Sequence, residues 1–61
     1  MNTMTEQEKR DVNIKLAQII EQIEIAQEIW LDGDRKECLL LLQGAIREIK
    51  RVAWKITPVL E

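Results

Sequence analysis

Apolar residues recur at alternating spacings of three and four along two segments of the chain, and one short break separates these segments. The first series is Val12, Leu16, Ile19, Ile23, Ala26 and Trp30, and the second is Leu39, Leu42, Ile46, Ile49, Ala53 and Ile56. This spacing is typical of α-helices that pack along their whole length. The pattern predicts an all-α chain with helices over about residues 6–31 and 35–56.

Residues that cap helices and form turns stand at the ends of both segments. Thr5–Glu8 and Asp34–Glu37 each match the capping box, in which two side chains satisfy the free backbone N–H groups of a helix start. Gly33 stands just past the first segment, where a helix often needs a residue with positive φ. Pro58 cannot continue the second helix. We therefore expect a tight turn at residues 32–34 and a short C-terminal tail.

The two apolar series are mirror images about the break. Val12 with Ala53, Ile19 with Ile46, and the other facing pairs all have position numbers that sum to 65. A constant sum is the signature of two helices that run antiparallel about a turn. The sequence thus predicts a helical hairpin and a single domain over residues 1–61.

A hairpin of 61 residues cannot enclose a core of its own, because each helix keeps one flank of its apolar stripe open to water. One Cys and no His leave no internal disulfide and no zinc-ligand set. Oligomerisation remains as the source of stability. We expect two hairpins to face each other in a homodimeric four-helix bundle, with a higher oligomer or a complex with another chain as alternatives. The expected dimer core is Val12, Leu16, Ile19, Ile23, Ala26, Leu39, Leu42, Ile46, Ile49 and Ala53.

A further apolar row flanks the second apolar series. Cys38, Ala45 and Val52 follow one another at intervals of seven and widen the apolar stripe. We expect Cys38 to be a buried small side chain, since the chain has no second Cys with which it could pair. Gly44, next to Ala45, either allows close approach of the helices or is a tolerated surface glycine.

Nothing in the composition supports catalysis, and we predict no catalytic residue, cofactor or metal site. The chain has no His and no Tyr, and its acids fall mainly at exposed helical positions. Glu21, Glu24 and Glu28 share one helix face, but no His completes a di-metal motif with them. The longest apolar run, Leu39–Leu42, is too short to span a membrane, and the N-terminus does not resemble a signal peptide. We expect a cytoplasmic protein with no membrane contact.

Two groups of residues are candidate binding surfaces. Residues Thr5–Gly33 hold seven acids and three bases, whereas Arg35–Thr57 hold six bases and two acids. One group is the basic stripe, which consists of Arg47, Lys50, Arg51, Trp54 and Lys55. Basic side chains beside an exposed aromatic ring can bind nucleic acid or an acidic protein. The alternative is a structural role, in which the charges pair with Glu8 and Asp11 and Trp54 covers the open end of the bundle. The other group is a candidate apolar docking face of Ile14, Ile25, Leu40 and Leu41.

Short strings of the sequence resemble Rop, the family of plasmid copy-number regulators that bind RNA on a dimeric four-helix bundle. These strings are Thr5-x-Gln7-Glu8-Lys9 with Asn13, Leu31-Asp32-x-Asp34, and Cys38. The resemblance implies a bundle architecture and an RNA partner. However, Ala17 stands where the family has an RNA-facing aromatic residue.

The preferred hypothesis is a small non-enzymatic regulator or adaptor that self-associates and binds another protein through a helix face. One alternative is a Rop-like regulator that binds RNA or DNA with the basic stripe. A second alternative is a bundle that binds a small ligand or a metal ion.

Overall fold

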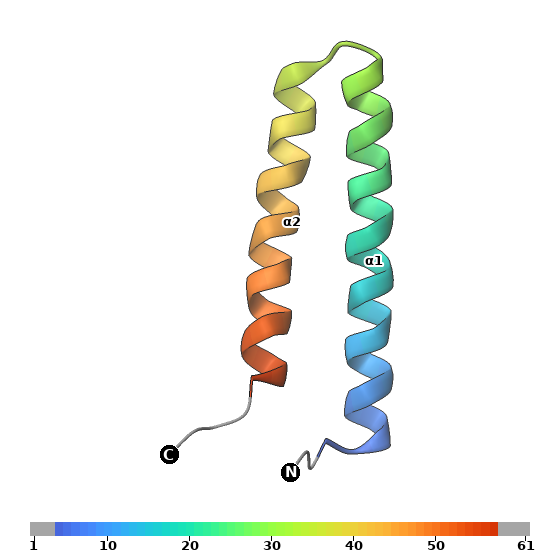
Figure 1. The fold of residues 1–61 in the computed structure, drawn as a ribbon, viewed down its shortest axis with the longest axis vertical. Coiled ribbons are helices and arrows are strands. Elements are labelled where there is room, and N and C mark those ends of the chain that lie inside the picture. Colours follow the sequence, from blue (N-terminus) through green and yellow to red (C-terminus); the bar gives the residue numbers. More distant parts are fainter. Residues whose placement is uncertain (1–3, 58–61) are drawn as a thin grey trace.

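The computed structural model describes residues 4–57, and within this range the chain forms two α-helices and no strand. Helix α1 spans Glu6–Leu31 and helix α2 spans Arg35–Ile56. The helices lie side by side and antiparallel, so that the start of α1 and the end of α2 lie at the same end of the hairpin (Figure 1). The predicted all-α fold is therefore confirmed. The expected C-terminal tail lies outside the described residues.

The start of α1 is a complete capping box. The Thr5 hydroxyl accepts a hydrogen bond from the Glu8 backbone N–H at 3.1 Å, and the Glu8 carboxylate accepts one from the Thr5 backbone N–H at 2.9 Å. This device satisfies two of the N–H groups that have no partner within the helix. The prediction at this end is confirmed.

The turn between the helices differs in one respect from the expected second capping box. The Asp34 carboxylate accepts from the Glu37 N–H at 3.0 Å, but the Asp34 N–H donates to the Ile29 carbonyl at 3.1 Å. The Gly33 N–H donates to the Trp30 carbonyl, and Gly33 has a φ of 89°. These two backbone bonds form a Schellman motif, which leaves the Asp34 N–H unavailable to Glu37.

Six residues are buried between the helices, and they form one row on each helix. The rows repeat every seven residues and are Val12, Ile19 and Ala26 on α1 and Cys38, Ala45 and Val52 on α2. No residue type larger than Ile is present in these rows. Met4 packs against one end of the cluster that contains Val12.

The buried rows are shifted by one position from the predicted facing pairs. Val12 and Val52 lie in one cluster, and the buried positions of the two rows have sums of 64 instead of 65. The row on α2 is therefore the one that the sequence pattern placed at the flank. The physical reason is size, because Cys38 and Ala45 let the helix axes approach where Leu39 and Ile46 would hold them apart.

Polar contacts tie the helices together along one side of the buried rows. The Gln22 amide Nε2 donates to the Leu41 carbonyl at 2.9 Å, and the Lys15 ammonium lies 3.9 Å from Glu48 Oε1. A Cβ atom on Gly44 would lie 3.0 Å from Gln22 Nε2. Gly44 is thus half-buried and leaves space for the Gln22 side chain, which favours the close-approach interpretation of this glycine.

The two glycines should respond differently to replacement by alanine. Gly33→Ala is expected to lower the free energy of unfolding by about 1 to 2 kcal/mol, because a Cβ atom is disfavoured at positive φ. Gly44→Ala gains about 1 kcal/mol of helix propensity and displaces only the end of a flexible side chain, so its net effect should be small. Urea denaturation followed by circular dichroism measures both. An equal loss in the two variants would contradict the assigned roles.

Candidate interaction surfaces

A continuous apolar surface opens along one broad side of the hairpin. On each helix, three large side chains stand four positions after a buried residue in the sequence. Other apolar side chains stand one position after a buried residue. Because the helices are antiparallel, the same offset points to the same side of the hairpin on both. We call this surface the apolar face; its members are Leu16, Ile20, Ile23, Trp30, Leu39, Leu42, Ile46, Ile49, Ala53 and Ile56.

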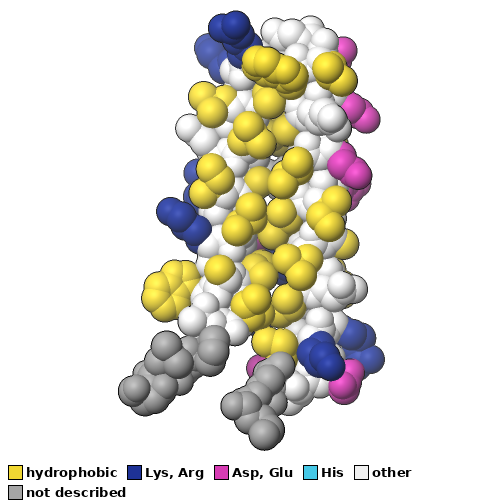
Figure 2. Space-filling view, viewed as in Figure 1, with side chains coloured by type: hydrophobic (Ala, Val, Ile, Leu, Met, Phe, Trp, Pro, Cys, Tyr) yellow, Lys and Arg dark blue, Asp and Glu magenta, His cyan; other side chains and the backbone are white. Residues whose placement is uncertain are grey.

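The side chains of the apolar face are strongly exposed to solvent. Its nine large members have between 39% and 59% of their surface accessible. Figure 2 shows hydrophobic side chains from both helices meeting along most of the length of the molecule, with charged groups confined to the edges. A face of this extent is unusual for a small monomer, whose exposed apolar residues are normally scattered.

The opposite broad side is polar. Residues that follow the buried rows by three positions include Lys15, Gln22 and Glu48, which make the contacts between the helices described above. Glu48 is half-buried and also accepts from Arg51 on its own helix, at 3.0 Å. Within residues 4–57, the two sides of the ribbon thus have different chemistry, and the large exposed aliphatic side chains gather on the apolar face.

The residues expected in a dimer core separate into two groups. Val12, Ile19 and Ala26 are buried between the helices of one chain. The other seven lie on the apolar face and are exposed within the chain. Their role in a dimer core stays a prediction.

The basic stripe lies along α2, with most of its residues on the outer side of this helix and Lys55 on the polar side. Trp54 is 80% exposed and does not cover the end of the hairpin. Within residues 4–57, the ion pairs join Glu48 to Arg51 and Lys15, and Glu6 to Lys9, so the stripe does not pair with Glu8 or Asp11. Arg47, Lys50 and Lys55 have no ion pair among these residues. The stripe is therefore a largely uncompensated positive surface with one exposed aromatic side chain.

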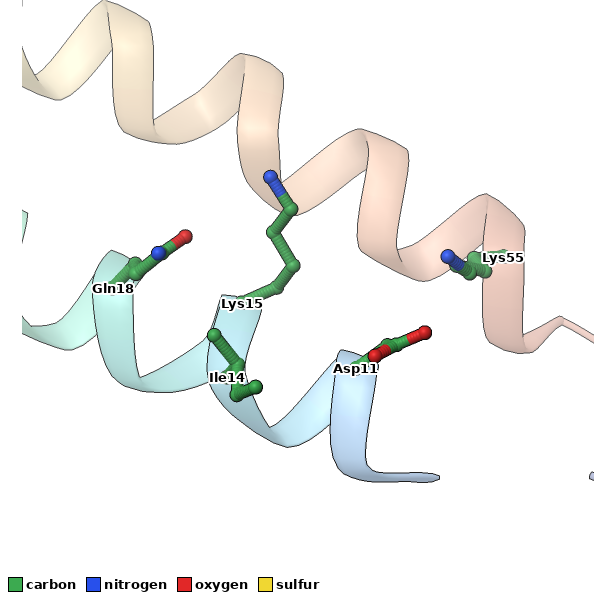
Figure 3. Close-up of a pocket in the computed structure, with 5 residues that line it drawn as sticks. All are labelled: Asp11, Ile14, Lys15, Gln18 and Lys55. Atoms are coloured by element: carbon green, nitrogen blue, oxygen red, sulfur yellow. The ribbon is translucent and has the colours of Figure 1, made fainter. Parts of the chain in front are cut away.

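A shallow depression lies between the helices on the polar side, near the open end of the hairpin. It is lined by Asp11, Ile14, Lys15 and Gln18 of α1 and by Lys55 of α2 (Figure 3). Its walls are mostly exposed side chains of mixed charge, and among the described residues nothing encloses a ligand there. The depression gives no support to the small-ligand alternative.

The four residues of the candidate apolar docking face do not form one surface. Ile14 borders the depression, and Ile25 lies eleven residues further along α1, about 16 Å away. Leu41 is half-buried beside Gln22, whereas Leu40 is 55% exposed on the outer side of α2. The continuous apolar face consists instead of members of the two apolar series, together with Ile20, which stands one position after a buried residue.

The described residues hold no group of three or more Cys, His, Asp or Glu side chains arranged to bind a metal ion. Cys38 is buried, as its position in the sequence predicts. Neither described helix is long and apolar enough to cross a bilayer. Comparisons with protein-family models, with curated proteins and with solved structures found no match to this chain.

The small residues of the buried rows should tolerate enlargement poorly. Ala45 is only 2% exposed, so Ala45→Leu would force the helices apart and is expected to cost about 1 to 3 kcal/mol of stability. Ala17→Leu, at an exposed position of α1, is the matched control and should leave stability within about 0.5 kcal/mol. Thermal denaturation of the two variants measures the difference. Equal stability would show that the buried rows do not set the helix spacing.

Proposed function

We propose that this chain is a non-enzymatic helical protein that works by helix-face binding: it self-associates through the apolar face and acts as a regulator or adaptor for another protein. The observation that carries the proposal is the apolar face, with nine large side chains that the described chain leaves 39% to 59% exposed. A surface of this kind marks a protein interaction site.

The dimensions of the face suit a protein interface. The molecule measures 45 × 23 × 11 Å, so its broad side offers roughly the 800 Å² that each partner contributes to a standard interface. The contact between the two helices buries only six residues. Such a small core supplies little stability at this chain length, and covering the face is the available way to bury more apolar surface.

Self-association would leave a second set of surfaces free for a different partner. The outer sides of the helices carry the uncompensated charges of the basic stripe and the exposed side chains Leu40 and Trp54. A regulator or adaptor needs such a surface in addition to the one that holds it together. We assign protein binding to these outer sides.

The proposal is tested first by the mass of the particle in solution. Sedimentation equilibrium should give at least twice the chain mass of 7.2 kDa. Ile46→Glu, on the apolar face, should shift the equilibrium toward monomer and lower the melting temperature, because it would bury an unpaired charge. Leu40→Glu is the matched control: it is equally exposed but lies on the outer side of α2, and it should leave the mass unchanged. A folded, concentration-independent monomer would refute self-association.

A specific observation also favours a second candidate function, the binding of nucleic acid. Trp54 is 80% exposed among basic side chains, and an aromatic ring in a positive groove can stack on unpaired bases. Titration with bulk RNA at two salt concentrations, read by Trp fluorescence, tests it. Binding that weakens with salt and is lost in Arg47→Ala/Arg51→Ala would support this function, and no binding at low salt would exclude it.

A further inference from the structure

We propose that the apolar face is covered by a second copy of the chain with the two turns at opposite ends of the bundle, so that α1 lies against the partner's α1 and α2 against the partner's α2. This inference rests on the proposed self-association and adds its geometry. It follows from the pattern of residues along the middle of the face on each helix.

Two copies can cover each other's apolar faces symmetrically in only two ways. In one, both turns lie at the same end and α1 packs on the partner's α2. In the other, the turns lie at opposite ends and each helix packs antiparallel on its own copy. Both are isologous twofold arrangements, so the same patch serves both copies. The side chains that point most directly toward the partner decide between them.

On α1 these side chains stand one position after each buried residue, and they are Asn13, Ile20 and Gln27. The row is polar, apolar, polar, and it is symmetric about Ile20. With the turns at opposite ends, Ile20 meets the partner's Ile20, and Asn13 comes level with the partner's Gln27 to within about two residues, or 3 Å. Amide side chains both donate and accept hydrogen bonds, so they can satisfy each other.

The equivalent row on α2 is Leu39, Ile46 and Ala53. It is centred on Ile46, with a large residue at one end and a small residue at the other. Antiparallel packing of α2 on the partner's α2 sets Leu39 beside the partner's Ala53, and the reverse pair forms by symmetry. Large residues set against small ones let facing helices interdigitate at an even spacing.

The same-end arrangement mismatches both rows. It sets Asn13 against the partner's Ala53 and Gln27 against the partner's Leu39. Each amide would then lose contact with water and gain no partner, at a cost of about 1 to 3 kcal/mol per buried group. The opposite-end arrangement removes this penalty at four positions of the dimer.

Charges at the edge of the face act in the same direction. Arg10 is exposed, and opposite-end packing brings it nearly level with the partner's Glu28. Same-end packing would instead bring Arg10 level with the basic region around the partner's Trp54. The net charges of the helices, −3 for α1 and +4 for α2, favour same-end packing. However, exposed charges are screened beyond about 8 Å at physiological salt, so the close contacts decide.

Disulfide crosslinking separates the two arrangements. In a Cys38→Ala background, Ile20→Cys and Ile46→Cys should each form a covalent dimer on mild oxidation, because each residue meets its own copy. In the same-end arrangement neither would crosslink alone at an enhanced rate, and only a mixture of the two would. Cα atoms more than about 7 Å apart cannot be bridged without backbone movement. Ile14→Cys in the same background, on the outer side of α1, gives the rate of random collision.

A distance measurement keeps the test valid if a cysteine in the face weakens association. Spin labels at Asp32→Cys, again in the Cys38→Ala background, should lie about 40 Å apart with the turns at opposite ends, since 26 helical residues separate the two levels. A distance below about 30 Å would overturn the arrangement while leaving self-association intact. Labels at Gln18→Cys, near mid-length, lie on the polar side at nearly the same level in either dimer, so they should show dipolar coupling in both arrangements. A monomeric mass with no dipolar coupling at Gln18 would instead overturn the self-association on which the inference rests.

Discussion

The close approach of two helices along rows of small side chains determines the rest of this structure. Ala26 and Ala45 are each 2% exposed, and neither leaves space for a larger group. With the small rows at the centre, the large aliphatic side chains are displaced to the sides of the contact. The hairpin therefore becomes a ribbon about 11 Å thick, and most of its apolar surface lies on its faces rather than between its helices.

Polar contacts between the helices determine which face of the hairpin is available to an apolar partner. Gln22 reaches the Leu41 carbonyl, and Lys15 reaches Glu48, on one side only. A partly exposed pair such as Lys15–Glu48 adds little stability, but it keeps that side solvated and excludes an apolar partner from it. The side with Leu16, Ile49 and their neighbours has no such contact, so docking is directed to it.

The sequence was sufficient to predict local structure but not the register of the helices. Thr5, Gly33 and Asp34 act at the positions where capping and turn chemistry place them, because these effects depend only on near neighbours. The predicted pairs of facing residues were wrong by one position. A spacing of three and four is shared by all residues of a wide apolar stripe, so it does not indicate which row of the stripe lies at the centre of the contact. Side-chain size at exact intervals of seven carried that information. The hydrogen bond from Gln22 to a backbone carbonyl is a single contact that does not depend on a repeated spacing, so no sequence pattern predicts it.

The proposed two-copy geometry would separate the opposite charges of this nearly neutral chain onto two sides of the dimer. If each helix packs on its own copy, the two α2 helices form one side of the bundle and the two α1 helices form the other. The bundle then has a basic side with an exposed Trp54 near each end and an acidic side, although the net charge of each chain is only −2. In this proposed arrangement, self-association would double the basic stripe instead of neutralising it. A binding partner that needs two positive surfaces would recognise the dimer and not the single chain, which couples partner binding to self-association by mass action.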